Sequence, residues 1–204
     1  MNRNVFINCP FDEEYLELFD ALLFAIYLCD CAPRCALEID NSAQIRLNKI
    51  YSIIEECDLG VHDISRTELN ANQLPRFNMP FEFGLFMGAK RFGDASQQDK
   101  NCVVFDQAPF RYVEFISDIA GQDIKSHDNK PEEVIRNIRN WLNTFSDLSP
   151  LPGAQAIIEQ FEQYCRDRQD ILDSLSLTPA DVQYADRILI IERWLSIDPL
   201  ESTD

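Results

Sequence analysis

Short apolar runs alternate with longer segments of helical periodicity along residues 1–146. The runs, rich in Val, Ile, Leu and Phe, are typical of buried strands and lie at 5–7, 35–39, 59–64, 102–105 and near 123–124. Apolar positions three and four residues apart predict the intervening helices, at 13–29, from 42 onward, at 80–89 and at 131–145. This alternation predicts an α/β fold with a five-stranded parallel sheet and right-handed crossovers.

A cluster of helix-breaking residues at 149–153, Ser-Pro-Leu-Pro-Gly, separates this region from the rest of the chain. We therefore predict an α/β domain at 1–146 and a C-terminal extension at 150–204. Helical periodicity in the extension predicts two helices, at 154–175 and 179–197, and Thr178 is suited to be the N-cap of the second. Two helices cannot form a core alone, so they are expected to pack on the domain or on another subunit. Removing the extension is accordingly expected to impair assembly or regulation more than the fold of the domain.

The composition restricts the partners of the protein. With 46% hydrophobic residues, a chain of 204 residues can bury a substantial core. Its formal net charge of −17 argues against direct contact with nucleic acid or with anionic membranes. The acid is concentrated at the end: residues 147–204 carry 12 acidic and 4 basic side chains, against 23 and 14 in residues 1–146. A regulatory protein with a basic surface is therefore expected to contact the C-terminal helices.

The cysteines indicate a reducing compartment, because there are seven, an odd number without disulfide-like spacing. Cys29, Cys31 and Cys35 are close in sequence, but without a fourth ligand nearby they do not predict a zinc site, and no metal or cofactor is expected. No apolar run is long enough to span a membrane, and residues 2–4 lead into the first strand without a signal peptide. We predict a soluble, cytoplasmic protein.

Glu82 is the strongest single indication of chemistry. It is expected in the first turn of the helix at 80–89, among Phe81, Phe83, Leu85 and Phe86. A carboxylate is costly to bury there, unless the helix N-terminus stabilises its charge by about 0.3–1 kcal/mol. An ionised, poorly solvated carboxylate at the ligand-binding edge of a parallel sheet is what a nucleophile requires. The alternative is a glutamate that only stabilises the first turn, with Asn78 as the N-cap.

Ligands of parallel α/β sheets bind at the carboxyl ends of the strands, where the first strand is followed by a polar turn. In this turn Asn8 offers both a donor and an acceptor, Pro10 stiffens the backbone, and Phe11 is placed to flank a base. The alternative is an ordinary strand-to-helix turn in which Asp12 caps the helix.

A second polar segment follows the third strand. Asp63 ends that strand and precedes Ser65, so its carboxylate is suited either to bind a ribose hydroxyl or to cap a turn. Arg66 and Arg76 lie in the irregular stretch 65–79 and are candidates to bind phosphate.

Four other residues complete the list of candidates. Arg46 suits either phosphate binding or a solvated helix surface, and Asn78, like Asp12 and Ser65, is counted among the predicted substrate-binding residues. His62 lies on an apolar strand and is interpreted as a core histidine, and Cys9 lacks an evident histidine partner for nucleophilic chemistry. The sequence contains neither GxGxxG nor GxxxxGK[ST], so no dinucleotide fingerprint or phosphate loop is present.

Three segments resemble the nucleoside 2-deoxyribosyltransferase-like family and, more distantly, the TIR domains that cleave NAD. Residues 5–11, Val-Phe-Ile-Asn-Cys-Pro-Phe, resemble the family's first strand and its Gly-Pro-x-Phe turn, with Asn8 and Cys9 ahead of the proline in place of the usual glycine. Residues 57–63, Cys-Asp-Leu-Gly-Val-His-Asp, resemble its strand that ends in an acid. Residues 81–90 resemble the family's Glu-x-Gly-x-x-x-(Ala/Gly)-x-x-Lys helix, whose glutamate is the nucleophile, and this match is the most specific of the three.

The resemblance implies a flavodoxin-like, Rossmann-like domain and an N-glycosidase. Glu82 would attack the anomeric carbon of an N-glycoside, with Asp63 and Asn8 positioning the substrate, and the glycosyl group would pass to water or to another base. NAD or another nucleotide is then a substrate and not a cofactor. Sites of the family are often completed by a neighbouring subunit, so a homo-oligomer is expected. Stand-alone bacterial relatives resemble glycohydrolase effectors of anti-phage defence, which suggests the same role by analogy.

Three other functions stay open at this stage. One is a nucleotide-sensing or assembly module without chemistry, because the sequence has no clear second acid or base. Another is a true nucleoside deoxyribosyltransferase, against which the acidic helical tail argues, since the transferases have no counterpart of it. The third is a purely structural partner protein.

Overall fold

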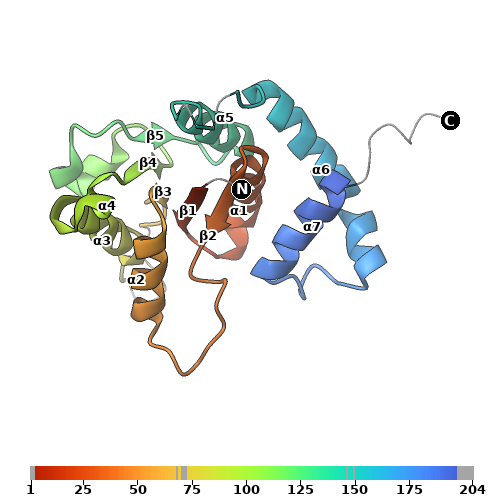
Figure 1. Cartoon of the computed structure of the whole chain (residues 1–204), viewed down its shortest axis with the longest axis horizontal. Helices are drawn as coiled ribbons and strands as arrows, with labels where there is room; N and C mark the ends of the chain where they lie inside the picture. Colours follow the sequence, from red (N-terminus) through yellow and green to blue (C-terminus); the bar gives the residue numbers. More distant parts are fainter. Residues whose placement is uncertain (1–2, 68, 70–72, 146, 149, 197–204) are drawn as a thin grey trace.

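The computed structural model describes residues 3–67, 69, 73–145, 147–148 and 150–196 (Figure 1). It confirms the predicted fold class: five parallel strands in the order β2-β1-β3-β4-β5, flanked by helices, form a flavodoxin-like doubly wound sheet. The strands are β1 (Arg3–Asn8), β2 (Cys31–Arg34), β3 (Leu59–Asp63), β4 (Asn101–Asp106) and β5 (Lys125–Ser126). The helices are α1 (Leu16–Leu28), α2 (Arg46–Glu56), α3 (Asn78–Phe92), α4 (Ala95–Gln98), α5 (Pro131–Leu142), α6 (Ala154–Leu175) and α7 (Tyr184–Ser196).

Helices cover both faces of the sheet. On one face Val5 and Phe105 pack with α1 and α5, and on the other Phe6 packs with α2 and α3. Successive residues of β1 thus enter opposite cores, as the pleat of a strand requires, and both faces are apolar because both are covered. Gly60 lets α3 come close, because a Cβ there would lie only 2.9 Å from the ring of Phe86.

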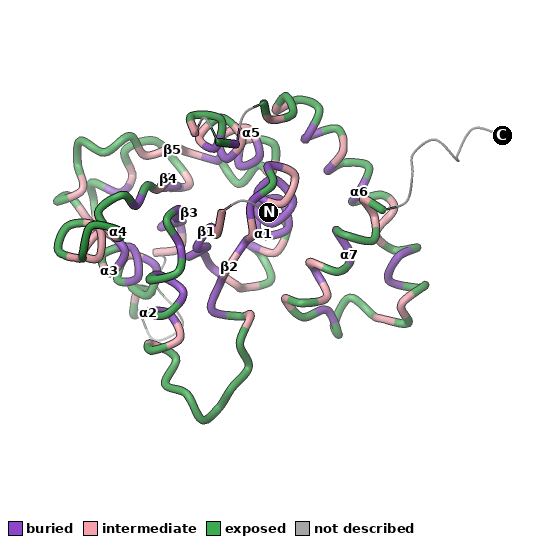
Figure 2. The backbone as a smooth tube through the Cα atoms, viewed as in Figure 1, coloured by how far each residue is buried: buried purple, intermediate pink, exposed green. Residues whose placement is uncertain are grey.

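Helix α1 is buried on all sides, with nine consecutive residues, 18–26, enclosed (Figure 2). One side faces the sheet and α5, and α6 and α7 cover the outer side. The ring of Phe24 lies 5.5 Å from that of Phe161, 5.1 Å from that of Tyr164 and 5.7 Å from that of Trp194, between centroids. The C-terminal helices therefore share one core with the α/β domain.

A buried carboxylate joins the three helices. Asp20 lies on the outer side of α1, where Arg168 of α6 donates to its Oδ2 at 2.8 Å and Arg187 of α7 donates to its Oδ1. Asp20 is 4% exposed and Arg187 is 7% exposed, so neither charge is hydrated by bulk water. Each charge is stabilised by the other and would be costly to bury alone.

The prediction of a strand at 35–39 was wrong, because β2 lies four residues earlier. Pro33 lies within β2 and has no N–H, which is tolerated because β2 is the edge of the sheet. Its carbonyl accepts a hydrogen bond from the hydroxyl of Tyr184. After β2 the chain turns at once, with the N–H of Glu38 donating to the carbonyl of Cys35.

Several helix starts differ from the prediction. Helix α2 begins at Arg46 and not at Ser42, and α3 begins at Asn78, which is therefore inside the helix and is not its N-cap. Thr178 does not cap α7, because its hydroxyl donates to Asp181 in a turn that precedes Tyr184. The bounds of α6 match the prediction, and the expected end of the last helix at 197 lies outside the described residues.

No helix within the described residues has both the length and the apolar character that crossing a bilayer demands.

Replacing Asp20 by Ala leaves Arg168 and Arg187 partly buried without their counter-charge. We expect the free energy of unfolding to fall by about 3–5 kcal/mol, the range typical for removal of one partner of a buried ion pair. Urea unfolding followed by circular dichroism measures the change. Asp170→Ala, at an exposed carboxylate of α6, is the control and should unfold like the wild type; an equally small effect of Asp20→Ala would contradict the role given to the ion pairs.

Removal of residues 150–204 uncovers the outer side of α1, including Phe24. Against the expectation from the sequence, we now predict loss of the cooperative fold of the remaining domain, because its central helix becomes exposed. Near-ultraviolet circular dichroism and thermal unfolding of residues 1–149 test this. A truncated protein that unfolds cooperatively at the temperature of the full chain would show that the domain is independent.

Candidate functional site

A cavity of about 160 Å³ lies at the carboxyl end of β1, beside the start of α3. The strand order reverses between β1 and its neighbour β3, and such switch points are where doubly wound sheets bind ligands. Seven of the predicted site residues line the cavity: Asn8, Pro10, Phe11, Asp12, Arg76, Asn78 and Glu82. Three lining residues were not among the predicted site residues: Cys9, Arg46 and Met79. Of these three residues, only Arg46 was considered as a phosphate ligand. Nothing in the sequence favoured phosphate binding over a solvated helix surface for this arginine.

Glu82 is 9% exposed and faces this cavity from α3. It lies in the second turn of the helix and not, as predicted, in the first, so the helix N-terminus contributes little to its charge. Burial raises the pKa of Glu82, and the positive charge of Arg46 opposes that rise. No hydrogen bond or ion pair from another described residue reaches its carboxylate. Glu82 is thus a desolvated carboxylate whose oxygens are available to a bound molecule.

Asn8 fixes the position of α3 relative to β1. Its amide nitrogen donates to the carbonyl of Met79 at 2.8 Å and contacts Nδ1 of His62 at 3.2 Å. Because both amide hydrogens are used within the protein, the side-chain oxygen is the group left for a ligand. Asn8 therefore both holds the start of the Glu82 helix and lines the cavity.

His62 is a core residue, as predicted. It is fully buried, and burial lowers its pKa to about 3, so the ring is neutral. Its ring centroid lies 5.0 Å from that of Phe83 and 4.8 Å from that of Phe86. Nδ1 faces the amide of Asn8, which places the ring proton on Nε2 and makes Nδ1 the acceptor.

The two arginines predicted to bind phosphate both contact Asp12. Arg66 lies 2.9 Å from Oδ1 of Asp12 and 2.6 Å from Glu14, and Arg76 lies 3.2 Å from Oδ2 of Asp12. Arg76 lines the cavity and Arg66 does not. Much of their donor capacity is therefore used by carboxylates of the turn after β1, and Asp12 is held in place from two sides.

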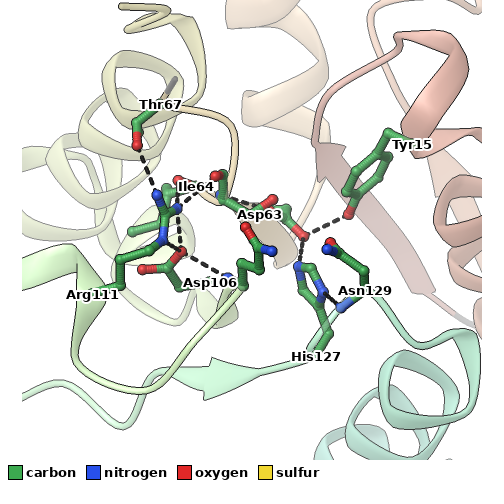
Figure 3. Close-up of polar contacts among 10 residues, drawn as sticks. Tyr15, Asp63, Ile64, Thr67, Asp106, Arg111, His127 and Asn129 are labelled. Atoms are coloured by element: carbon green, nitrogen blue, oxygen red, sulfur yellow. Dashed lines mark hydrogen bonds and ion pairs between the residues drawn. The ribbon is translucent and has the colours of Figure 1, made fainter. Parts of the chain in front are cut away.

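Asp63 and Ser65 lie behind the cavity and do not line it. Asp63 is fully buried: the hydroxyl of Tyr15 donates to its Oδ2 at 2.6 Å, the N–H of Ser65 donates to Oδ1 at 2.8 Å, and Nε2 of His127 lies 3.1 Å from Oδ2 (Figure 3). Burial raises the pKa of Asp63, but the contacts with His127, Ser65 and Tyr15 outweigh it and leave the pKa below the ordinary value. Asp63 thus organises neighbouring residues, and no ligand in the cavity touches it in this conformation.

A second buried acid, Asp106 at the end of β4, was not predicted. Its Oδ1 accepts hydrogen bonds from Arg111 and from the N–H of Gln107, and burial raises its pKa. Arg111 also donates to the hydroxyl of Thr67 at 2.9 Å and to the carbonyl of Ser65 at 2.5 Å (Figure 3). This network ties β4 to the segment that follows β3. An acid after the apolar run at 102–105 is the signal that would have identified it, the same signal that drew attention to Asp63.

The cysteines offer no nucleophile or metal site. Burial raises the pKa of Cys9 well above its ordinary value, and the charge of Asp63 raises it further, so the thiol stays protonated. Burial raises the pKa of Cys29, Cys31 and Cys35 to about 12. Within the described ranges, no three potential metal ligands among His, Cys, Asp and Glu lie together.

Comparisons with models of protein families, with curated proteins and with solved structures find no significant match to this chain. The resemblance to the nucleoside 2-deoxyribosyltransferase-like family therefore stays a prediction that rests on the residues of the sequence.

Proposed function

We propose that the protein is an N-glycosidase that cleaves the bond between the base and the sugar of NAD or of another nucleotide, with Glu82 as the nucleophile. The observation that carries the proposal is the carboxylate of Glu82, which is buried, has no partner among the described residues and faces a cavity at the switch point of the sheet. Keeping a charged group in such a place is unfavourable for stability, so a catalytic role is the better explanation.

The other residues of the cavity suit a sugar. The side-chain oxygen of Asn8 and the carboxylate of Asp12 are acceptors for sugar hydroxyls, and Asn78 supplies donors as well. The ring of Phe11 is an apolar surface on which a sugar or a base can stack. Asp63 does not line the cavity, so its part in this arrangement is structural: it holds Tyr15 and Ser65 in place.

The reaction follows from this arrangement. One oxygen of Glu82 attacks the anomeric carbon, the bond to the base nitrogen breaks, and its electron pair leaves with the base. Water then attacks the same carbon, which restores the carboxylate and gives the free sugar. The water releases one proton: a departing purine or pyrimidine base takes it up, whereas nicotinamide leaves NAD as a neutral base and the proton passes to solvent. A second base in place of water would make the protein a transferase.

A second candidate function is a nucleotide-sensing module without chemistry. The observation that favours it is the absence of a general acid beside Glu82: within the described part of the chain, Asp12 is held by two arginines and Asp63 is enclosed. Binding of a nucleotide that remains intact would distinguish this function from the proposed one. Assembly into a homo-oligomer and a role in anti-phage defence remain predictions from the resemblance, and a regulatory partner remains a prediction from the acidic charge of the C-terminal region.

Replacing Glu82 by Gln removes the nucleophile and keeps the shape of the side chain. We expect the release of free base to fall by more than about 1,000-fold, because no covalent intermediate can form. The purified protein is incubated with NAD and a panel of nucleotides, and free bases are identified by mass spectrometry. Glu132→Gln, at an exposed glutamate of α5, is the control and should act like the wild type. Full activity of Glu82→Gln would exclude the proposed mechanism.

The same variant has a predicted effect on stability. A carboxyl group whose pKa is raised by folding binds more protons in the folded state, so the free energy of unfolding falls as pH rises from its ordinary value of 4.5 through the raised pKa. Glu82→Gln has no carboxyl group to ionise, so its free energy of unfolding does not fall in this way. It should unfold at a higher temperature than the wild type at neutral pH, and the difference should vanish below pH 4.5. Thermal unfolding across this range measures it. A variant less stable than the wild type at neutral pH would show that the buried charge of Glu82 does not lower the free energy of unfolding.

A further inference from the structure

A second, larger cavity of about 410 Å³ adjoins the cavity of Glu82. Phe11 and Arg46 line both, so these two side chains form the boundary between them. The smaller cavity alone lies below the roughly 300–1,000 Å³ typical of ligand sites, whereas the two together fall within that range. A ligand that places its sugar against Glu82 therefore has room to extend past Arg46 into the larger cavity.

Basic side chains outnumber acidic ones in the lining of the larger cavity, although the protein as a whole is strongly acidic. Its charged lining residues are Arg46, Lys49, Arg187 and Asp40, of which Arg187 is paired with Asp20. Arg46 makes no hydrogen bond or ion pair with another described residue, and Lys49 donates only to the carbonyl of Ile39, at 3.1 Å. Most donors of these two cations are therefore available to an anion.

Helix α7 and the residues just before it form one wall of this cavity. The wall consists of Val182 and Gln183, which precede α7, and of Tyr184 and Arg187 within it; the segment between β2 and α2, which extends between α2 and α7 in Figure 1, also lines the cavity. This wall is held firmly, because Tyr184 donates to the carbonyl of Pro33 and Arg187 donates to Asp20. Phe19 of α1 also lines the cavity, and its ring centroid lies 6.5 Å from that of Tyr184.

We propose that the larger cavity is a second subsite, which binds the phosphate-bearing part of the substrate. Lys49 and Arg46 lie on one side of this part, and the wall formed by α7 lies on the other. This inference rests on the proposed function for the identity of the reacting sugar. It makes the C-terminal helices part of the binding site, which neither the sequence pattern nor the resemblance implied. A phosphate ester gains charge-assisted hydrogen bonds from the two cations, and a nucleoside without phosphate does not.

Binding is measured by calorimetry in the Glu82→Gln background, so that no turnover occurs. The probes are four nucleosides, adenosine, guanosine, cytidine and uridine, and their 5′-monophosphates. At least one monophosphate should bind about tenfold tighter than its nucleoside, since a hydrogen bond to a charged group contributes that much or more. Lys49→Glu should abolish this preference, whereas Lys125→Glu, on the far strand β5, should keep it.

The wall is tested separately with Gln183→Trp, which fills the cavity from an exposed position just before α7. It should weaken the monophosphate about tenfold and leave the nucleoside unchanged, because only the phosphate reaches the larger cavity. Gln163→Trp, at an exposed position of α6, is the matched control and should bind both like the parent.

The inference and the proposed function fail in different ways. Equal affinities for nucleosides and monophosphates, no binding of any probe, or unchanged monophosphate binding in Gln183→Trp would each overturn the second subsite. A wild-type protein that releases base without any phosphate preference would support the glycosidase activity and exclude the second subsite. A protein that shows the phosphate preference but releases no base would support the second subsite and exclude the glycosidase activity.

Discussion

The pairing of Asp20 with two arginines is the interaction on which the arrangement of the helices depends. A carboxylate in the enclosed part of α1 cannot be buried alone, so this helix can be enclosed only if Arg168 and Arg187 approach Asp20. These arginines come from different C-terminal helices, and satisfying one acid therefore places both helices. Apolar contacts such as those around Phe24 supply most of the burial, while the ion pairs select one orientation of α6 and α7 on α1.

The candidate site is built on similar constraints. Asn8 uses its amide hydrogens on the Met79 carbonyl and on a neutral His62, and so connects the first strand to the helix that carries Glu82. Arg111 holds the segment after β3 by its contact with Ser65. Asn8 and Asp12 beside Glu82 are thus held by protein partners, whereas Glu82 has none among the described residues. A buried carboxylate without such a partner is the feature that distinguishes this cavity chemically.

The sequence predicted the fold and much of the cavity for physical reasons. Alternating apolar runs and helical periodicity determine a parallel sheet, and residues after β1 necessarily meet the helix after β3 at the switch point. It left Arg46 open between phosphate binding and a solvated helix surface, because the loop that brings α2 to the cavity carries no periodic signal. It also missed Asp20, which is hidden in an apolar run. Asp63 and Asp106 give the same signal, an acid that ends a strand, and only the geometry shows that both are enclosed by protein partners.

The contact between Tyr184 and Pro33 also affects how the sheet edge meets other molecules. Strand β2 is an outer strand, and the exposed N–H and C=O groups of such a strand are a template for adding strands from another chain. Pro33 has no N–H to offer, and its carbonyl is already occupied by the tyrosine hydroxyl. A strand from another chain could therefore form no hydrogen bond with position 33, because the N–H is absent and the carbonyl is already bonded. The C-terminal helices thereby protect this edge of the protein from uncontrolled self-association.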